Sequence, residues 1–173
     1  DGLRKVPLNV PNREIIEPHL GKPLSSIPDP FGVDESFSAH MNRRLREFLD
    51  SFGFEYSFRS STECYRSGQF NQGMQLLLER VDSVLDIILP TLRPASREGW
   101  SPFMVVCPSC GRNLSTSVTG YHPERGTVSF RCDGGRTGDL PGCAHEGESS
   151  VLDGHAKVGW KVDWALRWFT FGI

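Results

Sequence analysis

The sequence has no long apolar run, no excess of basic residues and no secretory leader pattern at its start. Among its 173 residues 23% are charged, and the formal net charge is −2 at pH 7, which excludes a strongly basic nucleic-acid surface over the whole chain. No apolar stretch approaches the roughly 18 residues that span a bilayer. We therefore expect no membrane partner, while a local basic face remains compatible with this charge. The apolar fraction of 38% is typical of a globular chain.

Both ends of the sequence look like cuts through a longer protein. The chain begins with Asp1 and not with Met, and it ends in Phe171-Gly172-Ile173 without a polar tail. We interpret these ends as internal positions of a larger polypeptide.

Cysteine is scarce, with five residues in all, yet four of them fall in one short stretch. An odd count and a C-x2-C pair in a chain of this length favour a metal site over disulfides. Four thiolates suit Zn²⁺, and a closed four-coordinate site is structural rather than catalytic. The predicted ligands are Cys107, Cys110, Cys132 and Cys143. His145 is an alternative fourth ligand, and buried thiols without a metal are the plainer interpretation.

Composition divides the chain into four predicted parts. Residues 1–34 are a Pro-rich strap with at most a short helix near residues 13–20, and residues 35–102 are mostly helical. Residues 103–157, rich in Gly and Cys with short β-like runs, are typical of a zinc ribbon. Residues 158–173 predict a strand followed by a helix. Cys64 is predicted to be a small buried apolar residue.

The apolar pattern predicts particular elements within these parts. A helix runs from about Phe37 to Leu49, is capped by Asp34 or Ser36 and ends at Gly53. Alternating aromatics at residues 54–58 predict a strand, and Thr62 is expected to cap a short helix. One long helix is expected from Phe70 to Leu89. The last part is expected as a strand at 158–162 and a helix at 163–171.

The most unusual segment contains Trp160, Asp163, Trp164 and Trp168. One interpretation is a strand-to-helix corner that packs its tryptophans in the core, with Asp163 as the helix N-cap. The other is the wall of a pocket, because indole faces attract an ammonium group and Asp163 could supply the opposing charge. A lysine-like ligand fits that chemistry.

Several motifs resemble the archaeal and bacterial class I lysyl-tRNA synthetases. These are Asp1-Gly2-Leu3-Arg4-Lys5-Val6-Pro7, the 23–32 and 35–40 segments, the cysteine knuckle, Cys143-Ala144-His145-Glu146-Gly147, and the run from Trp160 to Trp168. The resemblance implies an α/β fold, in which the chain is part of a Rossmann-type catalytic domain with a helical insertion and a small β-rich zinc ribbon. It also implies a lysine–tRNA ligase that uses lysine, ATP with Mg²⁺, and tRNA(Lys), together with a structural Zn²⁺. Such an enzyme is expected in the cytoplasm and has no DNA partner.

The resemblance also suggests roles for particular residues. Trp160 is the expected wall of the amino-acid pocket, with Asp163, Trp164 and Trp168 as further candidates. Four arginines are candidates for contacts with tRNA phosphates: Arg43, Arg44, Arg46 and Arg66.

The sequence departs from the family pattern in two respects. The His-x-Gly-His and Lys-Met-Ser-Lys-Ser motifs, which grip ATP, are absent, so the catalytic residues are unknown and we expect the segment alone to be inactive. Family members can carry a second zinc in the strap. Here Asp29 and His40 match that ligand set, but Val33 and Asp34 replace a Cys and a His. Val33 cannot ligate, so we favour no metal at Asp29, Asp34 and His40. The plainer interpretation is that Asp29 caps a turn and His40 packs on its helix.

Two other functions are compatible with a cysteine knuckle taken alone. A stand-alone zinc ribbon that binds RNA or a protein partner is the main alternative. A zinc hydrolase is disfavoured because it needs an open coordination position, which four cysteines would close.

Overall fold

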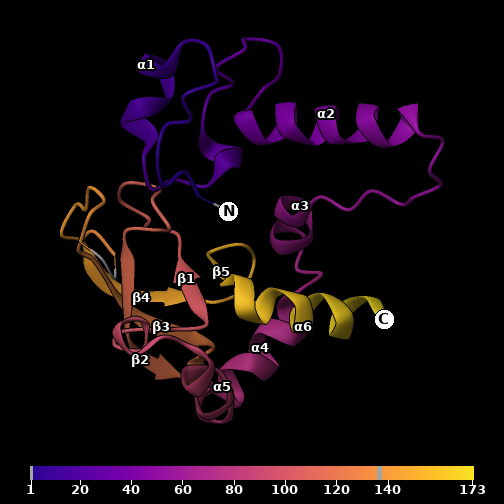
Figure 1. The fold of residues 1–173 in the computed structure, drawn as a ribbon. Coiled ribbons are helices and arrows are strands. Elements are labelled where there is room, and N and C mark those ends of the chain that lie inside the picture. The colour runs from indigo at the N-terminus through magenta and orange to yellow at the C-terminus, as the bar shows by residue number, and fades with distance from the viewer. Residues whose placement is uncertain (1, 136–137) are drawn as a thin grey trace.

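The computed structural model describes residues 2–135 and 138–173. Figure 1 shows three regions. The strap with α1 lies at one end of the molecule, and α2 projects sideways from it. The small sheets and the bundle of α3 to α6 lie at the other end. An extended segment connects the far end of α2 back to α3. Asp1, the first residue of the predicted strap, lies outside the described residues.

Six α-helices are described, several of them short. Their bounds are α1 Arg13–Ile16, α2 Phe37–Ser51, α3 Ser61–Arg66, α4 Asn71–Glu79, α5 Val81–Ile88 and α6 Trp160–Phe171. The predicted start of α2 is confirmed, because the Ser36 hydroxyl accepts a hydrogen bond from Ala39 N at 3.1 Å. Among the described helices, none is long and apolar enough to cross a membrane.

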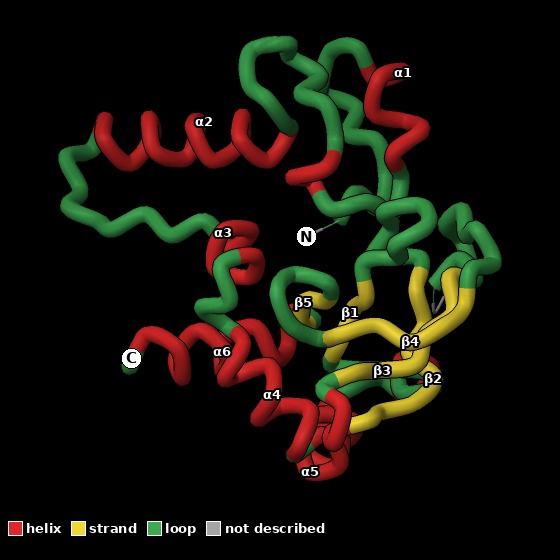
Figure 2. The backbone as a smooth tube through the Cα atoms, turned by 180° about the vertical axis from the view of Figure 1, so that it is seen from behind, coloured by secondary structure: helices red, strands yellow, loops and turns green. Residues whose placement is uncertain are grey.

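The strands form two small antiparallel sheets (Figure 2). They are β1 Phe103–Val105, β2 Thr116–His122, β3 Thr127–Cys132, β4 Glu146–Ser150 and β5 Ala156–Val158. Strands β2, β3 and β4 make one sheet in that order, and β1 pairs with β5. The expectation of a β-rich ribbon is therefore confirmed. The parallel sheet of a Rossmann domain is not found among the described residues.

One large core joins the helices to the sheets. Phe70, Met74 and Leu78 from the helical region and Val105 and Phe130 from the strands are each at most 2% exposed and belong to the same cluster. A smaller core, formed by Leu3, Ile16, Ile27 and Phe37, holds the strap together.

Gly21 joins the strap to the ribbon. Its carbonyl oxygen accepts hydrogen bonds from Asn113 N at 2.9 Å and Leu114 N at 3.0 Å. The residue has φ +83°, and a Cβ there would lie 2.6 Å from the Ser115 hydroxyl oxygen. Glycine is required because both the backbone conformation and the close approach exclude a side chain.

The prediction of a strand at residues 54–58 is wrong. The segment is extended without a strand assignment, and Phe54, Tyr56 and Phe58 are 58%, 38% and 37% exposed. Alternating side chains need a neighbouring strand to bond the backbone, and no described strand lies beside this segment.

Three helix boundaries also differ from the expectations. The predicted long helix is divided at Arg80, whose φ of −110° and ψ of 19° are not helical. Beyond the bend Val81, Val84 and Leu85 still pack on the same core, so the apolar periodicity did not reveal the division. Ser60, rather than Thr62, caps α3. Helix α6 already begins at Trp160 after Gly159, so Asp163 lies inside the first turns and is not the N-cap.

Candidate metal centre and neighbouring surfaces

The four predicted cysteines converge at one point of the ribbon. One sulfur atom from each of Cys107, Cys110, Cys132 and Cys143 lies within 4.8 Å of all the others. The Sγ atoms of Cys107 and Cys143 are 3.6 Å apart, and those of Cys110 and Cys132 are 3.7 Å apart. A disulfide requires about 2.05 Å. Tetrahedral zinc with Zn–S bonds of about 2.3 Å separates its sulfurs by about 3.8 Å. The observed spacing therefore fits a metal and not a disulfide.

Two backbone turns present these sulfurs. In the first, Gly111 N donates to Cys107 O at 2.8 Å and Cys107 N donates to Arg112 O at 2.9 Å. Gly111 has φ +73°, as the tight turn after a C-x2-C pair requires.

The second turn joins Cys132 to the segment around Cys143. Cys132 N donates to His145 O at 2.8 Å, and Ala144 N donates to Cys132 O at 2.9 Å. Ala144 adopts φ +59°, which is uncommon for a residue with a side chain. No local pattern predicted this turn, because Cys132 and Cys143 are far apart in the chain and alanine is not a typical turn residue. Residues 136 and 137 of the intervening loop lie outside the described residues.

The thiols differ in their environments. Cys107 and Cys132 are buried, Cys110 is half-buried and Cys143 is exposed. Burial raises the pKa of the Cys107 and Cys132 thiols. The backbone N–H of His145 lowers the pKa of Cys143 to about 6, which favours its thiolate form. A bound cation would favour the thiolate form of the others.

The ring of His145 does not join the sulfur cluster. His145 is exposed, and its ring lies 5.8 Å from the Phe130 ring between centroids. Its contribution to the site is the backbone N–H bond to Cys143. The geometry thus favours Cys143 over His145 as the fourth ligand. Cys64 lies apart from the cluster and is 4% exposed, in the core.

The three tryptophans line one exposed side of α6. Trp160, Trp164 and Trp168 are 70%, 51% and 53% exposed, and successive rings lie 6.1 and 6.4 Å apart. In the described residues they are not packed in the core. Asp163 pairs instead with Arg167, whose Nε lies 2.6 Å from Asp163 Oδ2. The carboxylate expected to face an ammonium group is therefore already paired with a guanidinium.

Trp160 also lines a pocket of about 530 Å³ between the strap, the ribbon and the start of α6. Arg4, Trp100 and Lys161 line it too, and no Asp or Glu is found among its described lining residues. Two cations without an acid make this pocket suited to an anionic group.

The four candidate arginines are set among acidic side chains. Arg43 NH1 lies 2.6 Å from Glu47 Oε1, and Arg44 NH1 lies 3.4 Å from Glu47 Oε2. The Arg46 guanidinium lies 5.6 Å from the centre of the Phe58 ring. Arg43, Arg46 and Arg66 line a second pocket of about 550 Å³. The same pocket is lined by Asp34, Glu35, Glu47, Asp50 and Glu63, so acids outnumber arginines there.

The second candidate metal group is formed by Asp29, Asp34 and His40, whose ligand atoms lie within 4.8 Å of one another. Asp29 caps a turn, because its carboxylate accepts hydrogen bonds from the N–H groups of Phe31, Val33 and Asp34. Burial acts to raise the pKa of Asp29, but these three bonds and the nearby His40 bring it below its ordinary value. The His40 ring stacks on Phe31 with centroids 4.2 Å apart.

The fold and the cluster define the class of the protein. It combines helices with small antiparallel sheets, and it carries a four-cysteine cluster that can hold a metal ion such as zinc.

Comparison with known proteins identifies the family. Residues 1–173 match the family model described as tRNA synthetases class I (K), and the chain belongs to this family. It is 42% identical over all its 173 residues to lysine–tRNA ligases from Rickettsia bellii (strain OSU 85-389) and Rickettsia felis (strain ATCC VR-1525 / URRWXCal2). It is 41% identical to the lysine–tRNA ligase of Rickettsia massiliae (strain Mtu5). The chain spans 31% of the length of these relatives.

Proposed function

We propose that this chain is a segment of a lysine–tRNA ligase, which activates lysine with ATP and Mg²⁺ and transfers it to tRNA(Lys). The observation that carries the proposal is the match of the whole chain to the class I lysine family, together with 42% identity to ligases of that name. The His-x-Gly-His and Lys-Met-Ser-Lys-Ser motifs are absent from the sequence. The segment by itself is therefore inactive, and the groups that grip ATP come from elsewhere in the enzyme.

The structural role of the segment follows from its cysteine cluster. Zn²⁺ held by Cys107, Cys110, Cys132 and Cys143 would fix the two turns of the ribbon that carry these cysteines. We retain the four-part division as a proposal: strap 1–34, helical region 35–102, ribbon 103–157, and a return to a Rossmann core at 158–173. A cytoplasmic location accompanies this function.

The pocket at Trp160 is the proposed substrate site within the segment. Its cationic lining by Arg4 and Lys161 suits the carboxylate of lysine or a phosphate of ATP better than the lysine ammonium group. Trp160 would then support the aliphatic stem. Trp164 and Trp168 extend the same face, and Asp163 would serve an ammonium group only if Arg167 released it.

A role of Arg43, Arg44, Arg46 and Arg66 in tRNA binding stays a prediction. The acids that surround three of them would repel phosphate. Arg44 contacts only Glu47 among the described ion pairs, and its side chain is 66% exposed.

The proposal is tested in the complete enzyme with lysine-dependent exchange between ATP and pyrophosphate, followed by aminoacylation of tRNA(Lys). Trp160→Ala should lower kcat/KM for lysine by at least tenfold, because it removes a pocket wall. The control Phe48→Ala removes an exposed aromatic ring on α2 that is not among the residues lining the pocket, and it should change kcat/KM for lysine by less than threefold. Activation of another amino acid, or RNA binding without any amino-acid activation, would overturn the proposal. The second result is the one that the stand-alone zinc-ribbon alternative predicts.

A further inference from the structure

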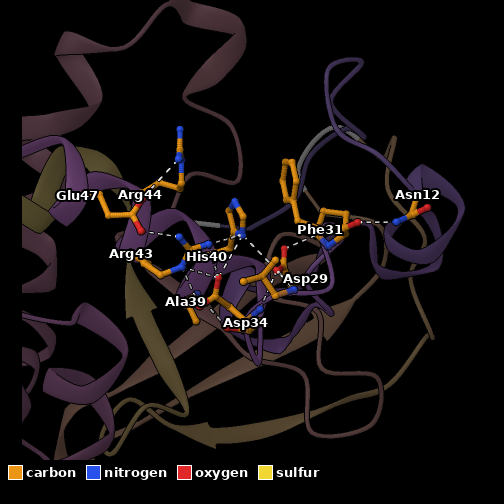
Figure 3. A network of polar contacts seen from close by, with 12 residues as sticks. Asn12, Asp29, Phe31, Asp34, Ala39, His40, Arg43, Arg44 and Glu47 are labelled. Atoms are coloured by element: carbon orange, nitrogen blue, oxygen red, sulfur yellow. Dashed lines mark hydrogen bonds and ion pairs between the residues drawn. The ribbon is translucent and has the colours of Figure 1, made fainter.

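The strap contains a closed cluster of charged groups at the start of α2 (Figure 3). His40 Nδ1 lies 3.2 Å from Asp29 Oδ2 and 3.2 Å from Asp34 Oδ2. The side chains of His40 and Asp29 are 9% and 1% exposed. Two carboxylates and an imidazole at such distances are a donor set that suits a divalent cation.

A cation from the protein already fills this position. Arg43 Nε lies 3.2 and 3.0 Å from the two oxygens of Asp34, and its NH2 lies 3.0 Å from Asp34 Oδ2. The same NH2 lies 3.4 Å from His40 Nδ1. In Figure 3 the guanidinium lies between the Asp34 carboxylate, the His40 ring and Glu47. A metal bound to His40 and Asp34 would therefore meet a fixed positive charge at contact distance.

The remaining carboxylate is also occupied. Asp29 Oδ1 accepts from Phe31 N at 3.1 Å, and Asp29 Oδ2 accepts from Val33 N and Asp34 N at 3.0 Å each. These bonds form the turn that leads into α2, so Asp29 cannot reorient toward a metal without breaking the turn. The donor set of the second zinc site that the family resemblance implies thus does not fit a metal in this chain.

We infer that Arg43 acts as the internal cation of this cluster, so that Asp29, Asp34 and His40 fasten the strap to α2 without a metal ion. The guanidinium neutralises Asp34, and the turn N–H groups satisfy Asp29. The cluster joins residues 29–34 to the first two turns of α2 through side chains alone. This arrangement also commits the Arg43 guanidinium to Asp34, His40 and Glu47, and it leaves little of its charge for an RNA phosphate.

The chain offers matched variants for a test. Arg43→Gln removes the internal cation, and Arg44→Gln makes the same charge change one residue away, where the only described ion pair is with Glu47. Arg43→Lys keeps the charge. Each variant is made in the full chain with the cysteine site loaded with zinc, and Mn²⁺ binding is followed by electron paramagnetic resonance. Mn²⁺ is chosen because it prefers oxygen and imidazole ligands and does not displace zinc from thiolates.

The wild type, Arg44→Gln and Arg43→Lys should bind no Mn²⁺ at this cluster at millimolar concentration. Arg43→Gln should bind one equivalent of Mn²⁺ at this cluster with an affinity at least tenfold higher than that of the wild type. A further Asp34→Asn change should abolish this gain in affinity. Equal binding by Arg43→Gln and Arg44→Gln would overturn the inference. A second zinc per wild-type chain that is lost in His40→Ala would also overturn the inference. This second test does not depend on whether the Arg43 variants fold. Neither result depends on which amino acid the enzyme activates.

Discussion

A single added methyl group at Gly142 should weaken zinc binding. A Cβ there would lie 2.6 Å from Cys132 O, 2.7 Å from Gly134 N and 3.0 Å from Asp133 C. All three are backbone atoms of the second knuckle, so the turn that holds Cys132 against Cys143 must open. Such crowding costs about 1–3 kcal/mol, which corresponds to roughly a 5- to 150-fold loss of affinity if the strain falls on the metal-bound geometry.

The assay is competition for Zn²⁺ between the chain and a chromophoric chelator. Gly147→Ala is the matched control, because Gly147 belongs to the same ribbon and a Cβ there would meet no atom within 4 Å. Gly142→Ala should bind zinc at least fivefold more weakly than Gly147→Ala, which should match the wild type. Affinities that agree within twofold would refute the argument that this turn sets the sulfur geometry.

Two further substitutions test the packing of the chain. Tyr65→Phe should lower the free energy of unfolding by about 1–3 kcal/mol, because it leaves buried Val158 N without the hydroxyl that accepts its hydrogen bond at 3.1 Å. Urea denaturation measures this loss, and a loss no larger than that caused by Tyr56→Phe at an exposed tyrosine would contradict the prediction. Asp29 has a folded pKa below its ordinary 3.8, so its contribution is complete above that value and is lost as pH falls through the folded pKa. In Asp29→Asn the free energy of unfolding should therefore fall less steeply below about pH 4 than in the wild type. The same pH dependence in both proteins would exclude this contribution of Asp29.

Local signals in the sequence predicted a large part of the fold. The cap at Ser36, the turn glycine at Gly53 and the apolar periodicity of α2 act within a few residues, and the helix appears with nearly those bounds. The C-x2-C pair likewise predicted the first knuckle. In each case the determining contacts lie close together in the chain.

The failures involve contacts that the sequence pattern does not encode. Alternation at residues 54–58 indicates a strand only if a partner strand is available, and none is described. Asp163 looked like a cap, but it pairs with Arg167 one turn further along α6. The ion pairs of Arg43 with Asp34 join the strap to α2, and the local pattern around Arg43 did not indicate them. The left-handed backbone of Ala144 has no residue signature.

The metal content of the purified chain tests the central claim most directly. Elemental analysis under reducing conditions, without exposure to chelators, is made on the wild type and on Cys110→Ser. The account predicts one zinc per wild-type chain and a loss of that zinc in the variant, because four sulfurs within 4.8 Å form one closed site. A wild-type chain that contains no zinc, or a Cys110→Ser chain that keeps a full equivalent, would contradict the four-cysteine centre.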